Sequence, residues 1–143
     1  MAGARAVALW REHLAEEERE RKAAYDRRHL KEHRQVVSFL RRAQLSYDRA
    51  GDPGTIARLQ RSLAPGLAAT RQSLDKIDHW GQSSNVIADY QALLDALDAP
   101  YARARLAAVK GDESPLLALR RDFAARLKKV DDWLAYAAEV DVD

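Results

Sequence analysis

The stretch LLALRRDFAARLKKVDDWL, residues 116–134, decides the fold class of this chain. Its large apolar side chains recur every three or four residues, the spacing at which side chains share one side of an α-helix. They are Leu116, Leu119, Phe123, Leu127, Val130 and Leu134. The residues between them are mostly charged or small, so one side of this helix can be buried while the other meets water. The stretch predicts an amphipathic core helix that starts at Pro115, after a stop at Gly111 and a cap at Ser114.

Turn-forming residues divide the rest of the chain into further helices. Residues 4–50 contain neither Pro nor Gly and would form a charged helix about 70 Å long if it were continuous, ending before Gly51. Gly51 suits the left-handed position after that helix, and Asp52 can cap a second helix over 54–80, which Pro65 breaks or kinks. A third helix is expected over 84–109, bent or divided at Pro100.

Composition agrees with an all-helical domain. Of the 143 residues, 47% are hydrophobic and 32% charged, which is typical of a globular chain, and no run alternates with the period of a β-strand. We therefore expect an all-α bundle of about four helices, arranged as two αα-hairpins, with a long charged N-terminal helix.

A phrase recurs in the sequence: LDKIDHW at 74–80 and LKKVDDW at 127–133. Each copy follows a Gly-Asp turn, with an apolar residue five positions after the glycine, Ile56 in the first copy and Leu116 in the second. The pattern indicates either a duplicated helical hairpin or chance similarity in a chain rich in Ala, Leu and Arg. In both cases we expect Trp80 and Trp133 to seal the ends of the core.

The segment AQLSYDRAGDPGTIARLQRSLAP, residues 43–65, resembles the turn region of a tetratricopeptide repeat, with Tyr47, the Gly51-Asp52 pair and Pro65. The resemblance implies a helical-hairpin scaffold and no ligand residues. It covers about 23 residues, and the recurrence in this chain is longer than the 34 residues of those repeats.

An apolar patch near the N-terminus is the main candidate for function. Val7, Trp10 and Leu14 share one helix side, but the charges Glu18 and Arg21 separate them from the core stripe. We therefore expect residues 1–24 to project from a bundle formed by residues 25–139, with an acidic tail at 140–143. This patch predicts an interaction module, a scaffold, adaptor or chaperone-like protein that binds a protein partner or its own copy.

A basic stripe supports an alternative function. Residues 1–50 carry twelve Lys or Arg and eight Asp or Glu, and the bases on one helix side are Arg27, Lys31, Arg34, Arg41 and Arg42. Such a stripe would suit a nucleic-acid-binding accessory protein, because each neutralised phosphate releases counterions. The other interpretation is a solvated helix surface, since acidic residues are interleaved.

Neither catalytic activity nor a strong metal site is expected of this chain. His29 and His33 lie one turn apart, a spacing that can hold a divalent metal, but a second ligand pair is missing, so they are weak candidates. The alternative is that both imidazoles lie at the border of the apolar side, half packed and half wet. The chain has no cysteine, no phosphate-cradling glycine loop and no Gly-x-Ser-x-Gly turn. We expect a non-enzymatic protein without a cofactor. No apolar run spans a membrane, and a cytoplasmic location is expected.

Overall fold

The computed structural model describes residues 2–77 and 85–139, and the secondary structure in these two ranges is entirely helical. The helices are α1 (Ala2–Arg28), α2 (Leu30–Arg49), α3 (Pro53–Ile77), α4 (Asn85–Ala96), α5 (Ala99–Val109) and α6 (Ser114–Glu139). The all-α class is therefore confirmed, whereas the expected number of about four helices is not. The expected acidic tail at 140–143 lies outside the described residues.

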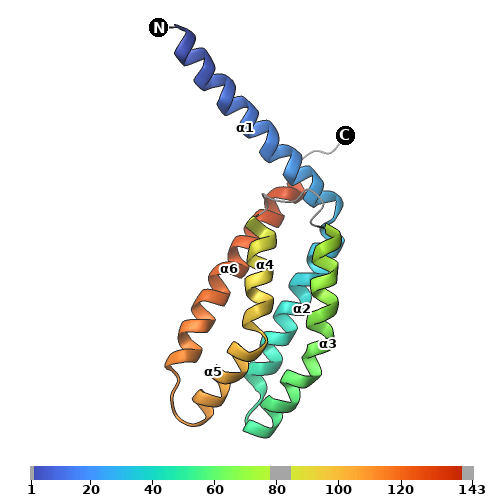
Figure 1. Cartoon of the computed structure of the whole chain (residues 1–143), viewed down its shortest axis with the longest axis vertical. Helices are drawn as coiled ribbons and strands as arrows, with labels where there is room; N and C mark the ends of the chain where they lie inside the picture. The colour runs from blue at the N-terminus through green and yellow to red at the C-terminus, as the bar shows by residue number, and fades with distance from the viewer. Residues whose placement is uncertain (1, 78–84, 140–143) are drawn as a thin grey trace.

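Helices α2 to α6 pack into an elongated body, and α1 leaves one end of it as a rod (Figure 1). Within the body, α6 packs against both α4 and α5, and α2 packs against α3. The second half of α1 contacts α6 and α2 before the chain enters the bundle. The first half of α1 extends beyond the rest of the molecule.

The core is built from the apolar sides that the helical spacing predicts. In α6, Leu119 is half-buried and the other five members of the stripe are buried. Across the body, the Tyr47 ring of α2 stacks on Tyr101 of α5 with centroids 5.2 Å apart, and Tyr101 meets Phe123 of α6 edge-on at 6.1 Å. These aromatic contacts tie three helices together, because each buries a large apolar area in a preferred ring geometry.

The two Gly-Asp turns are built differently, so the structure does not confirm a duplicated hairpin. Gly111 has the left-handed φ of +103°, but Gly51 does not have a positive φ, and its predicted left-handed conformation is wrong. Asp52 caps α3 as predicted, with the Thr55 amide donating to its carboxylate at 2.9 Å. At the second turn Ser114 is not the cap; its amide instead donates to Asp112 at 3.2 Å. Ile56 and Leu116 are both buried, so the positions after the turns do correspond in burial.

The helix breaks were predicted only in part. The chain divides at residues 97–98, before Pro100, as one of the two expected outcomes. By contrast, α3 continues through Pro65 without ending. The N-terminal helix is interrupted at His29, whose amide donates to the Asp26 carbonyl at 3.1 Å in a tightened turn, so a single 70 Å helix does not form. Neither Pro nor Gly marks this break, although Asp26 and His33 on either side of it are both buried.

Candidate functional site

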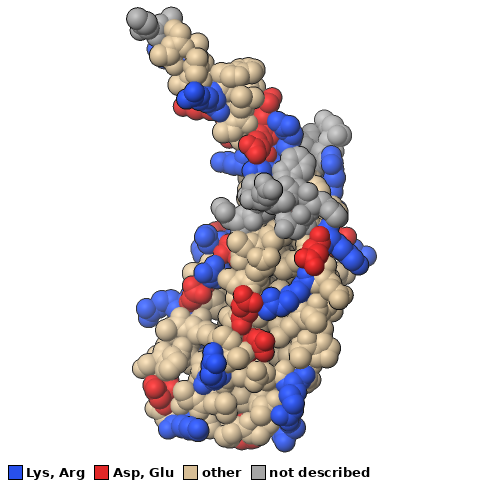
Figure 2. Space-filling model, viewed as in Figure 1, with Lys and Arg blue, Asp and Glu red and all other residues tan. Residues whose placement is uncertain are grey.

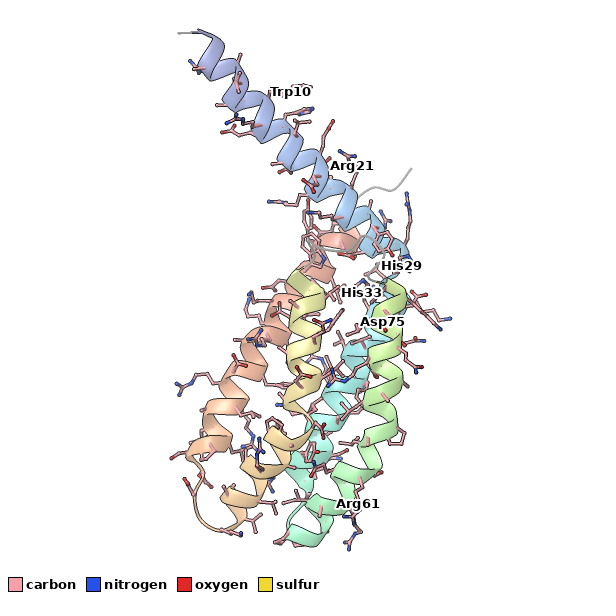
Figure 3. The ribbon with its side chains drawn as sticks, in the orientation of Figure 1. Trp10, Arg21, His29, His33, Arg61 and Asp75 are labelled. Atoms are coloured by element: carbon pink, nitrogen blue, oxygen red, sulfur yellow. The ribbon has the colours of Figure 1, made fainter. Side chains whose placement is uncertain are left out.

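The outer part of α1 carries the apolar patch predicted from the sequence. All residues from Gly3 to Arg21 are exposed. Val7 is 51% exposed, Trp10 61% and Leu14 42%, and Trp10 lies well outside the bundle (Figure 3). We call Gly3, Val7, Trp10 and Leu14 the α1 stripe, because their 4-3-4 spacing places them along one side of the helix. Leu9, which the sequence pattern did not single out, is also exposed, at 56%, but it lies on another side of α1.

The charges that end the α1 stripe mark where α1 meets the bundle. The Arg19 guanidinium lies over the Tyr136 ring of α6, 5.2 Å from its centroid, and Lys22 Nζ lies 3.3 Å from a Glu18 carboxylate oxygen. Here α1 and the ends of α4 and α6 border an open hollow of about 600 Å³, lined by Trp133, Tyr136 and both acidic and basic side chains. The view of surface charge shows the narrow rod and the wider body that it leaves (Figure 2).

A buried polar cluster joins α1 to the bundle. His33 of α2 is fully buried, and its Nδ1 shares a hydrogen bond of 2.8 Å with the Tyr90 hydroxyl of α4. Its Nε2 lies 3.3 Å from the buried Asp26 carboxylate of α1, but the angle is not that of a directed hydrogen bond. Trp133 of α6 donates its indole N–H to the same carboxylate. Burial, with smaller effects of the nearby Asp26 and Asp131 charges, raises the Tyr90 pKa above its ordinary value.

This polar cluster corrects the interpretation of His33. We expected His29 and His33 at the border of the apolar side, half packed and half wet. His33 is instead in the core, with Nδ1 hydrogen-bonded to Tyr90 and Nε2 3.3 Å from Asp26, while His29 is half-buried as expected, with its ring 4.6 Å from that of Tyr25. They do not face a shared ligand position. Across residues 2–77 and 85–139, no group of three or more His, Asp or Glu side chains could hold a metal ion.

The basic stripe is exposed along its length, as a nucleic-acid interface would require. Arg27, Lys31, Arg34, Arg41 and Arg42 are all at the surface. Arg41, however, is bonded to Asp131 of α6, and the Arg42 guanidinium donates to the Ser38 carbonyl at 3.3 Å. An ion pair with Asp131 lowers the positive potential that a phosphate would meet. Nucleic-acid binding therefore stays a prediction of the sequence alone.

The second copy of the recurring phrase is structural. Trp133 is half-buried against the core, as predicted for a sealing residue, and it also bonds Asp26. Asp131 and Asp132 point to different partners, Arg41 and Lys128. In the first copy, Leu74 and Ile77 are buried in α3, whereas Trp80 lies outside the described residues.

No protein-family model, no curated protein and no solved structure matches this chain. Within the part of the chain that the structure describes, none of the helices has the length and apolarity needed to cross a membrane.

Proposed function

We propose that this chain is a protein-docking module that binds a partner through the α1 stripe. One observation supports this most directly: among the Trp, Tyr and Phe side chains of the described residues, Trp10 alone is exposed, at 61%, while the others are buried or half-buried. Aromatic side chains anchor protein interfaces because they bury a large area at a small cost in conformational entropy.

The exposed position of the α1 stripe suits a partner that binds α1 along its apolar side. The α1 stripe lies on the part of the molecule that projects beyond the bundle, so a partner can reach it without displacing another helix (Figure 1). Full burial of a side chain of the size of Val or Leu contributes roughly 1.5–3 kcal/mol, so Val7, Trp10 and Leu14 together can support a specific contact. The pattern is that of an amphipathic helix seated in a groove or against another helix.

The test compares Trp10→Ala with Leu9→Ala, a matched control on the same helix with similar exposure. Proteins retained by the immobilised full chain are identified by mass spectrometry, and the partner so identified is then titrated against each variant. We expect Trp10→Ala to weaken binding by about tenfold or more and Leu9→Ala to leave it nearly unchanged. Both variants should keep the helicity and melting temperature of the parent chain.

Two results would contradict docking through the α1 stripe. Equal partner affinity in Trp10→Ala and Leu9→Ala would show that Trp10 is not the anchor. A large fall in melting temperature for Trp10→Ala would show that Trp10 stabilises the fold instead of serving a partner.

A further inference from the structure

We propose that the partner of the α1 stripe is a second copy of this chain, with the two α1 helices paired antiparallel over residues 2–15. This inference rests on the proposed function, and it adds the identity of the partner, the direction of pairing and the register.

The register follows from the spacing of the α1 stripe. Side chains at 4-3-4 intervals form the a and d positions of a coiled-coil heptad, with Val7 and Leu14 at a and Gly3 and Trp10 at d. In an antiparallel pair, each a residue of one helix lies against a d residue of the other. The one register that pairs all four positions of the α1 stripe and leaves no charged residue in the seam places Val7 against Trp10 and Gly3 against Leu14. Each layer then combines a small and a large side chain and occurs twice about a twofold axis, as an isologous interface requires.

Charge favours this antiparallel register. The first turn of α1, which starts at Ala2, contains no acidic side chain to balance the positive end of the helix dipole. In the antiparallel pair this end lies beside Glu16, Glu17 and Glu18 of the other copy, just past the last apolar layer. Parallel pairing would instead continue the seam with Glu17 against Glu17 and Arg21 against Arg21, which is repulsive.

The free length of α1 matches the length of the seam. Ala15 borders the hollow with Trp133 and Tyr136, and one turn further on Arg19 lies over the Tyr136 ring of α6. Residues 2–15 provide about 21 Å of free helix at 1.5 Å per residue. An antiparallel second copy ends where the bundle begins, so the two bundles lie at opposite ends of the pair. The side chains that flank the seam include Ala4 and Ala6, which allow the two helices to approach closely.

A seam of four layers is short, so we expect the dimer to be in equilibrium with the monomer. Contacts of this size are below the usual range of permanent interfaces, and a dissociation constant of roughly 10–100 μM is expected. Sedimentation equilibrium of the full chain over a concentration series measures this constant. Trp10→Ala should raise it by about tenfold or more, and Leu9→Ala should leave it within about twofold.

The direction of pairing can be tested with cysteine, because the chain contains none. Ala4 and Arg11 flank the same side of the seam, and in the antiparallel register Ala4 of one copy lies beside Arg11 of the other. The double variant Ala4→Cys/Arg11→Cys should form a covalent dimer in a glutathione redox buffer. Within one chain these positions are about 10 Å apart along the helix, too far for a disulfide. Each single variant should stay largely uncrosslinked.

Gly3→Cys separates the two directions. In a parallel pair, the cysteine at position 3 of one copy lies opposite the same cysteine of the other copy. In the antiparallel pair, the two cysteines are about 16 Å apart along the seam. The antiparallel register is overturned if Gly3→Cys forms a disulfide-linked dimer efficiently. It is also overturned if Ala4→Cys/Arg11→Cys forms no disulfide-linked dimer. A chain that sediments as a single copy at about 0.5 mM, well above the expected dissociation constant, overturns pairing with a second copy. Docking to a different protein is decided separately, by the titration of the identified partner.

Discussion

Three buried tyrosines provide a graded test of how polar groups stabilise this fold. The substitutions are Tyr90→Phe, Tyr101→Phe and Tyr47→Phe. All three keep the ring and its packing, and each removes one hydroxyl group. The hydroxyls differ in their partners: Tyr90 bonds His33 at 2.8 Å, Tyr101 donates to Asp48 at 2.8 Å, and Tyr47 has no hydrogen-bond partner among the described residues.

The expected magnitudes follow from what each substitution leaves behind. Tyr90→Phe leaves Nδ1 of the fully buried His33 without its partner, at a cost of about 1–3 kcal/mol in the free energy of unfolding. Tyr101→Phe should cost about 1 kcal/mol or less, because Asp48 is half-exposed and keeps its bond from Arg120 at 2.7 Å. Tyr47→Phe removes an unsatisfied buried hydroxyl, so it should be neutral or slightly stabilising.

Urea unfolding at neutral pH, followed by circular dichroism and tryptophan fluorescence, measures the three free energies in one series. Equal slopes with denaturant are required for a direct comparison of midpoints. The reasoning is refuted if Tyr90→Phe costs no more than Tyr101→Phe, or if Tyr47→Phe costs as much as either. In that case the cluster around His33 would not determine the stability of the junction.

Two further predictions concern pH and packing. Burial raises the pKa of Tyr47 to about 12, with a smaller effect of the Asp98 charge, so the folded state holds this proton more tightly than the unfolded chain. The resulting stabilisation is complete below the ordinary tyrosine pKa of about 10 and is lost as pH rises from there toward 12; melting temperatures across this range should fall less steeply in Tyr47→Phe. In α3, a Cβ at Gly66 would lie 2.6 Å from the Phe39 ring of α2, so Gly66→Ala should lower the free energy of unfolding by about 1–2 kcal/mol. Gly3→Ala, with open space around the new methyl group, is the control and should not lower it.

Helical periodicity was sufficient to identify most of the core. Five of the six members of the α6 stripe are buried as predicted, and Leu119 is half-buried, because an amphipathic helix has only one side that can leave water. Asp52 was identified as a cap for the same local reason, since its carboxylate reaches the Thr55 amide within one turn. The exposure of Trp10 was expected because charges follow the α1 stripe at the positions that a core helix would keep apolar.

The polar cluster at the junction could not be predicted from the sequence. Asp26, His33, Tyr90 and Trp133 come from four helices, and up to 107 positions separate members of the cluster. Nothing in the local pattern distinguishes a histidine that will be buried from one at the border of an apolar side. The break at His29 was missed because neither Pro nor Gly, the usual signals of a helix break, is present there.

The sequence by itself determined which residues form helices and which side of each helix is apolar, because these properties depend on neighbours within one or two turns. Only the tertiary structure decided that the chain turns at His29, that α1 leaves the bundle near Arg21 and that Gly66 lies under Phe39. It also decided that Gly51 and Gly111, in similar phrases, adopt different conformations. These features depend on contacts between residues far apart in the chain, whose geometry is set when the helices pack together.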